Sequence, residues 1–66
     1  MRIVERVADT AENQFAAENI RSELAQRAES EGVSARYGVL NIRSVDERIR
    51  PRTTNPWIII ERKVEW

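Results

Sequence analysis

Carboxylates, arginines and hydroxyl groups are the side chains that could do chemistry in this 66-residue sequence, which has no His and no Cys. Without those two residue types, a Ser–His–Asp triad, a thiol nucleophile and a zinc site built on Cys or His are excluded. Two acidic pairs could seat a hard cation: Asp9 with Glu12, and Asp46 with Glu47. We expect the first pair to cap a helix instead, and the second to solvate a loop. The sequence therefore predicts no catalytic residue, no metal site and no cofactor, and it argues against an enzyme.

Arg48, Arg50 and Arg52 occupy every second position of a Pro-containing stretch. In an extended segment they would project to one side and could grip a phosphate or a carboxylate bidentately. Direct nucleic-acid binding is disfavoured by the neighbouring Asp46 and Glu47, by the net charge of zero and by the lack of interleaved aromatics. The alternatives are a loop that recognises an acidic protein patch and a loop that is merely solvated.

Acidic and basic side chains balance overall, 11 against 11, but they are not evenly distributed. Residues 9–31 hold six acidic and two basic side chains, whereas residues 32–66 hold seven basic and four acidic ones. A helix that displays Glu18, Glu23 and Glu29 could compete for a cationic groove that otherwise holds a phosphate backbone. The alternative is an ordinary solvated helix face.

Five segments follow one another along the chain. Residues 2–8 are rich in β-branched side chains and predict a strand, and residues 11–30 are rich in Ala, Glu, Gln and Arg and predict a helix. Residues 36–45 and 57–66 alternate between two faces and predict two further strands. Residues 46–56 contain two prolines and several turn-forming residues, and so predict a loop.

The ends of the predicted helix carry recognisable signals. Asp9 can cap its start while Glu12 closes a capping box, and Thr10 with Asn13 offers a second, weaker frame. Gly32 is the natural left-handed stop.

The even-numbered faces of the last two strands are the more apolar, and they are expected to carry the helix. The predicted core between helix and sheet is Leu24, Leu40, Ile42, Ile58 and Ile60, and Val64 and Trp66 share its strand face. The odd-numbered face then has no assigned cover. Its members are Tyr37, Val39, Trp57 and Ile59. We interpret this face as a protein-binding surface, for a second copy or another partner, unless the loop 46–56 folds over it.

Phe15 lies on the side of the predicted helix opposite Ile20 and Leu24. Two interpretations stay open. Phe15 could pack beneath the first strand or the connection 32–36 as a satellite of the core, or it could be an exposed anchor for a partner.

Together the segments predict one α+β domain over residues 1–66. We expect a two-layer βαββ fold in which one helix packs on a three-stranded, mostly antiparallel sheet of order 1-3-2. No apolar run approaches the roughly 20 residues needed to cross a bilayer, and no signal-peptide core is visible, so a cytoplasmic location is expected. A chain this small with no disulfide also makes a homodimer an open expectation.

The whole layout resembles the small phage-derived anti-CRISPR proteins that inhibit type I effector complexes, several of which pack one helix on an antiparallel sheet. The segments that carry the resemblance are RIVERVAD, AENQFAAENIRSELAQRAE, YGVLNIRSV and WIIIERKVEW. The resemblance implies a non-enzymatic inhibitor that docks on the crRNA-guided surveillance complex in a bacterial host and blocks target DNA. Its candidate contacts would be the acidic side chains Glu18, Glu23 and Glu29 or the aromatic sheet face.

Two other functions remain open from the residues. One is a small nucleic-acid-associated regulator that grips phosphates through Arg48, Arg50 and Arg52. The other is a homodimer with a purely structural role.

Overall fold

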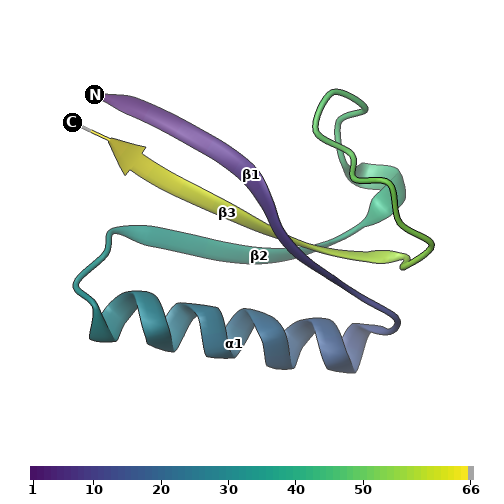
Figure 1. Ribbon diagram of the computed structural model, residues 1–66, viewed down its shortest axis with the longest axis horizontal. Helices are drawn as coiled ribbons and strands as arrows, with labels where there is room; N and C mark the ends of the chain where they lie inside the picture. Colours follow the sequence, from purple (N-terminus) through teal and green to yellow (C-terminus); the bar gives the residue numbers. More distant parts are fainter. Residues whose placement is uncertain (66) are drawn as a thin grey trace.

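The computed structural model of the chain describes residues 1–65 and confirms the predicted fold class (Figure 1). The elements are β1 (Arg2–Ala11), α1 (Gln14–Ser30), β2 (Ala35–Asn41), the single 3-10 turn η1 (Ile42–Ser44) and β3 (Trp57–Glu65). The sheet order is β1-β3-β2, and β3 pairs antiparallel with both neighbours. One helix packed on a three-stranded antiparallel sheet is therefore the architecture, as predicted. The prediction for Trp66 lies outside the described residues.

β1 runs three residues further than the predicted strand 2–8. Its ladder with β3 contains a bulge between Val7 and Asp9 and then continues to the pair Ala11↔Trp57. A bulge adds one residue to one strand and increases the local twist. β1 can therefore follow the twisted sheet down to the start of α1 (Figure 1).

The start of α1 differs from the prediction. The side-chain oxygen of Asn13 accepts the N–H of Ala16 at 2.8 Å, which is the bond of an N-cap residue. Asp9 lies inside β1, where its carboxylate accepts the N–H of Thr10 at 2.8 Å. The prediction that Asp9 caps the helix and Glu12 closes the box is wrong, because pairing with β3 keeps Asp9 and Thr10 extended.

Gly32 ends α1 as predicted, with a φ of +69°. The N–H of Val33 donates to the carbonyl of Ala28 at 2.8 Å, and the N–H of Gly32 donates to the carbonyl of Glu29 at 3.2 Å. These two bonds form a Schellman motif, which requires a left-handed residue at the position of Gly32. The motif turns the chain back towards the sheet.

β2 is shorter than the predicted strand 36–45. The side chain of Asn41 accepts the N–H of Arg43 at 3.0 Å, and this starts the turn η1. The N–H of Ile42 donates to the carbonyl of Pro56 at 2.8 Å, which joins the two ends of the loop between β2 and β3. Ile42 therefore belongs to the turn and not to a strand face.

α1 covers the face of the sheet that carries the odd-numbered side chains of β2 and β3. Ile59 and Ala17 are fully buried in this layer. Around them pack Ala8, Ala16, Ile20, Leu24, Tyr37, Val39 and Trp57. The helix–sheet core is therefore formed by small helix side chains against aromatic and β-branched strand side chains.

The sequence-based choice of the helix-bearing face is wrong. The predicted protein-binding face is instead part of the core, and its members are Tyr37, Val39, Trp57 and Ile59. The apolar side chains of residues 57–60 are consecutive, so alternation along β3 does not distinguish its faces. The small Ala16 and Ala17 let α1 approach closely, and the large strand side chains fill the space between the layers.

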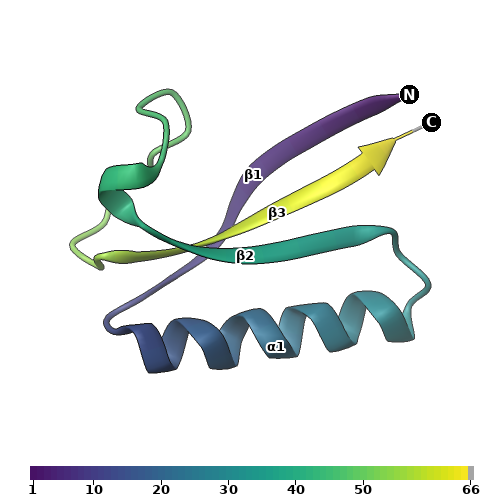
Figure 2. The same ribbon diagram turned by 180° about the vertical axis from the view of Figure 1, so that it is seen from behind.

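Val45 covers part of the opposite sheet face, and the loop 46–56 that follows it stands away from the sheet on this side (Figure 2). Val45 is buried against Ile58 and Ile60, which forms a second apolar cluster on this side. The amide of Asn55 donates to the hydroxyl of Thr10 at 2.8 Å and ties the loop to β1. Ile58 and Ile60 are therefore core residues as predicted, but they pack with Val45, Val7 and Ile42 and not with Leu24.

Candidate functional site

The outer face of α1 carries the three glutamates predicted to contact a partner. Glu18, Glu23 and Glu29 are all exposed. Glu18 accepts a hydrogen bond from Arg21 at 3.1 Å, whereas Glu23 and Glu29 form no ion pair within residues 1–65. Two of the three carboxylates are thus free to pair with an external cation.

Phe15 lies in the first turn of α1, and at about 1.5 Å of rise per residue the three glutamates follow it roughly 4.5, 12 and 21 Å further along the helix axis. Its exposed fraction is 78%, and among the large apolar side chains of residues 1–65 only Met1 is more exposed. The interpretation of Phe15 as a satellite of the core is therefore wrong. At about 100° per residue, Phe15 lies between Glu18 and Glu29 on one flank and Glu23 on the other. The outer face of α1 thus presents an exposed aromatic ring at its N-terminal end and exposed carboxylates along the rest of its length.

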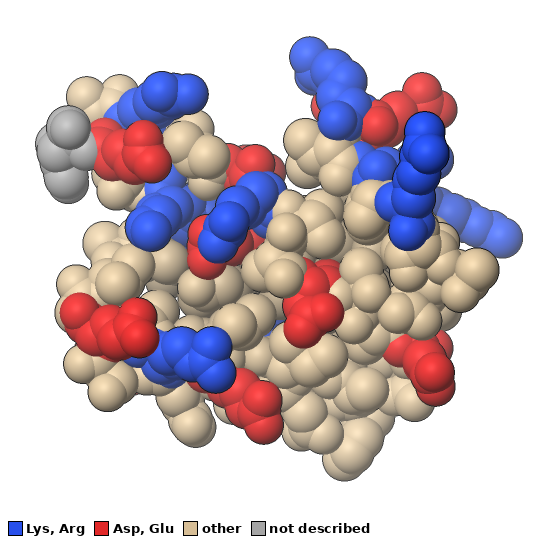
Figure 3. Space-filling model, in the orientation of Figure 1, with Lys and Arg blue, Asp and Glu red and all other residues tan. Residues whose placement is uncertain are grey.

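Charge is distributed unevenly over the molecule (Figure 3). In this view Asp and Glu side chains are spaced along the lower part, where α1 lies. Lys and Arg side chains are more frequent above the sheet and on the loop. A cationic partner surface is therefore attracted to the helix side of the molecule more than to the loop side.

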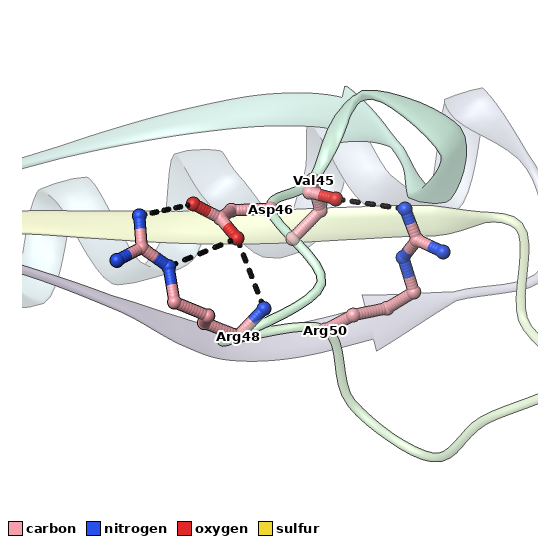
Figure 4. Close-up of polar contacts among 4 residues, drawn as sticks. All are labelled: Val45, Asp46, Arg48 and Arg50. Carbon is pink, nitrogen blue, oxygen red and sulfur yellow. Dashed lines mark hydrogen bonds and ion pairs between the residues drawn. The ribbon is translucent and has the colours of Figure 1, made fainter.

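The arginine-rich loop adopts a turn and not the extended conformation that the sequence suggests (Figure 4). The N–H of Ile49 donates to the carbonyl of Asp46 at 3.0 Å, and the N–H of Arg48 donates to the Asp46 carboxylate at 3.0 Å. The guanidinium of Arg48 also pairs with Asp46, at 2.9 Å. These contacts hold the pKa of the Asp46 carboxyl below its usual value, with the Arg48 side-chain hydrogen bond as the largest cause.

The three loop arginines do not project together from one side of the loop. Arg50 donates to the backbone carbonyl of Val45 at 2.9 Å, and in Figure 4 its guanidinium points away from that of Arg48. Arg52 is exposed and makes no side-chain hydrogen bond within residues 1–65. The prediction that they project to one side is wrong for Arg48 and Arg50. Both side chains have contacts that stabilise the loop.

A polar cluster that the sequence did not indicate lies on the helix side of the sheet. Glu61 is only 7% exposed, although it is charged. One of its oxygens accepts a hydrogen bond from Arg6 at 2.7 Å, and the other accepts one from the hydroxyl of Tyr37 at 2.7 Å. The three residues lie in one row across the sheet, because Glu61 is directly opposite Arg6 on β1 and opposite Tyr37 on β2.

The cluster favours an ionised Glu61. The hydrogen bond from Arg6, followed by that from Tyr37, holds the pKa of the Glu61 carboxyl below its usual value. The bond to Glu61 raises the pKa of the Tyr37 hydroxyl, and so favours its neutral form. A carboxylate with a lowered pKa and both oxygens engaged is a poor general base at neutral pH. The cluster is therefore suited to fixing the register of the three strands.

Glu61→Gln is expected to reduce stability at neutral pH by about 1–3 kcal/mol, since it weakens two partly buried hydrogen bonds. The folded pKa of Glu61 is lowered, so its ionisation contributes stability that is present above the unfolded pKa. That contribution is lost as the pH falls through the folded pKa. Urea denaturation from pH 7 to pH 3 should therefore show a shallower acid loss of stability in the variant than in the wild type.

Glu5→Gln is the matched control, because Glu5 pairs with Arg62 at 2.8 Å on the exposed face of the same sheet. It should change the free energy of unfolding at neutral pH by less than about 1 kcal/mol. If the free energy of unfolding fell equally from pH 7 to pH 3 in the wild type and in Glu61→Gln, the role given to Glu61 would be contradicted.

The outer face of α1 is the surface on which exposed charge and an exposed aromatic side chain coincide. Residues 1–65 bring no group of three metal-ligating side chains together. Within the same residues, no helix has the length and apolar character required to cross a membrane. No protein-family model, curated protein or solved structure matches this chain, so no residue role is transferred to it from a relative.

Proposed function

We propose that this chain is a non-enzymatic protein-interaction module that docks through the outer face of α1 on a cationic surface of a partner protein. The observation that carries the proposal is the exposed Phe15 on the same helix face as three exposed glutamates. A few residues that become buried on binding carry most of the energy of an interface, and aromatic side chains, Phe included, are enriched in interface cores. Charges around such a centre mainly steer encounter and select the partner.

The partner class follows from the sign of the charge and from the resemblance of the whole layout to anti-CRISPR proteins. A groove that holds nucleic acid is lined with Lys and Arg, and an acidic surface can occupy it in place of phosphates. The proposed partner is therefore a type I CRISPR–Cas surveillance complex, and the proposed effect is that target DNA no longer binds. The loop arginines support nucleic-acid binding less well, because Arg48 and Arg50 already contact Asp46 and the carbonyl of Val45.

The experiment is a competition between this chain and target DNA for a purified, crRNA-loaded type I complex. The wild-type chain should displace the DNA, and free DNA should not bind the chain itself at about 0.15 M salt. Replacing Glu18, Glu23 and Glu29 together by Gln should weaken binding to the complex about tenfold, since peripheral charges contribute roughly 0.5 kcal/mol each. The affinity of the triple variant should also depend less on salt.

The matched control replaces three exposed glutamates outside the outer face by Gln: Glu12, Glu31 and Glu65. This variant has the same net charge as the test variant and should inhibit like the wild type. Equal losses in the two triple variants would show that only net charge matters, and would contradict docking through α1. Tight binding of free DNA by the wild type would contradict the competitor mechanism altogether.

A further inference from the structure

The sheet face opposite α1 contains a hollow that neither the helix nor the loop fills. Its volume is about 290 Å³. It is lined by Glu5, Arg36, Gly38, Leu40, Ile60 and Arg62. A Cβ atom placed on Gly38 would meet nothing within 4 Å, and Leu40 is 40% exposed. The hollow therefore has an apolar floor that is open to solvent.

An arm formed by residues 46–50 rises beside this hollow, on the same side of the sheet. The base of the arm is fixed there, because Val45 packs on Ile58 and Ile60. Figures 1 and 2 show the loop standing away from the sheet on the side opposite α1. Ile49 lies in the turn of the arm and is 38% exposed. A partly exposed apolar side chain thus stands next to an apolar hollow on one surface.

We propose that this surface binds a second copy of the chain about a two-fold axis, with Ile49 of each copy inserted above Gly38 of the other. A two-fold interface uses the same patch on both subunits, so a projection and a recess side by side become complementary after rotation. The outer face of α1 stays free in both copies, and the proposed function does not depend on the dimer.

The charges at this surface fit the same arrangement. Glu5 pairs with Arg62 at 2.8 Å and Asp46 with Arg48 at 2.9 Å, so these four groups are engaged within one copy. Three further charges are exposed and form no ion pair within residues 1–65: Glu47 and Arg50 on the arm, and Arg36 on the rim of the hollow. Arg50 is held by the carbonyl of Val45 at 2.9 Å, whereas the Glu47 and Arg36 side chains make no hydrogen bond within the described residues. When the arm of one copy enters the hollow of the other, Glu47 approaches Arg36 across the interface.

The exposed area of the chain also favours a second copy. The accessible surface is 5163 Å² for a mass of 7.7 kDa. A compact monomer of this mass exposes only about 4,300 Å². The excess is close to the roughly 800 Å² that each partner buries in an interface of standard size.

Sedimentation velocity over a range of micromolar concentrations tests the proposal, with the helical circular dichroism signal as the check on folding. The wild type should sediment as a dimer. Gly38→Val fills the hollow with a residue that suits a strand, and Ile49→Asp removes the apolar projection. Each variant should keep its helical signal and weaken the dimer at least about tenfold.

A charge exchange provides the sharper test, because neither Arg36 nor Glu47 has an ion-pair partner among residues 1–65 of its own copy. Arg36→Glu and Glu47→Arg should each shift the equilibrium to monomer, and the double variant should dimerise again. Glu23→Arg makes the same change of charge as Glu47→Arg on the outer face of α1, and should leave the dimer intact. A monomeric wild type, a folded Gly38→Val variant that still dimerises like the wild type, or a double variant that stays monomeric would overturn the proposal.

Discussion

Replacing Ile59 by Ala is expected to lower the free energy of unfolding by about 2–5 kcal/mol, which is most of the stability of a domain this small. Ile59 is fully buried at the centre of the layer between α1 and the sheet. Truncation loses the transfer free energy of three carbon atoms and leaves a cavity beside Ala17. Ala17 is itself fully buried and too small to fill the space. Urea denaturation followed by circular dichroism measures the loss.

Ile3→Ala is the matched control for this prediction. Ile3 is the same residue type in a neighbouring strand, but it is 55% exposed and faces away from α1. Its truncation should cost less than about 1 kcal/mol. If the two variants unfold at the same urea concentration, α1 does not cover the odd-numbered face, and the helix–sheet packing described above is wrong.

The order of elements and the sheet topology could be predicted from sequence because each rests on a strong local signal. Residues 14–30 contain neither Gly nor Pro, and Gly32 with φ of +69° marks their end. Two strands joined through a helix that runs back along the sheet are parallel, and a third strand that follows the second through a loop and lies between them pairs antiparallel with both. These constraints leave few arrangements for a chain of 66 residues.

The face that carries α1 could not be predicted, since it depends on the phase of the pleat and not on composition. Residues 57–60 are apolar at every position, so both faces of β3 satisfy the hydrophobic pattern. The bulge in β1 adds to the difficulty. Before it the even-numbered residues of β1 face α1, and after it the odd-numbered ones do. As a result the four side chains predicted to bind a partner are in the core. These large aromatic and β-branched side chains do contribute to the structure, but through packing under α1 and not through partner binding.

The cluster of Glu61, Arg6 and Tyr37 was missed for a related reason. These residues are far apart in sequence and become neighbours only in the observed register, where Glu61 is opposite both of the others. A charged residue that follows four apolar ones in a central strand is the available signal. Such a residue is rarely buried unless it is paired. With the strand register known, the contact of Glu61 with Arg6 and Tyr37 could have been predicted.

The sequence did contain a signal for the turn in the arginine-rich loop, namely Asp46, but the alternating spacing of the arginines suggested an extended segment instead. Asp46 precedes the turn, and Asp side chains commonly accept the backbone N–H two residues further on. The structure shows this bond, from Arg48 to Asp46 at 3.0 Å. The alternation of Arg48, Arg50 and Arg52 would require an extended chain, which the turn at residues 47–49 prevents. Local side-chain chemistry here outweighs periodicity.

Phe15→Ala is the change expected to weaken partner binding most. An exposed Phe that enters a pocket on the partner is a typical hot spot, and its truncation costs about 2 kcal/mol or more, which corresponds to a loss of affinity of roughly 30-fold. Stability should not fall, because the ring is 78% exposed and Ala is the better helix former. Affinity for the type I complex and the free energy of unfolding should therefore change independently.

Gln26→Ala is the matched control: it shows whether the loss of affinity is specific to Phe15 or follows any truncation on the outer face of α1. Gln26 is an exposed residue of α1 that lies about 20° around the helix from Phe15, so both belong to the outer face. Its truncation removes contact area without removing an aromatic ring, and should lower the affinity by less than about threefold. A Phe15→Ala variant that binds like the wild type would show that α1 docks through charge alone or not at all. If the affinity then fell in the triple Glu→Gln variant, charge would remain as the basis of docking; if it did not, the outer face of α1 would not be the binding surface.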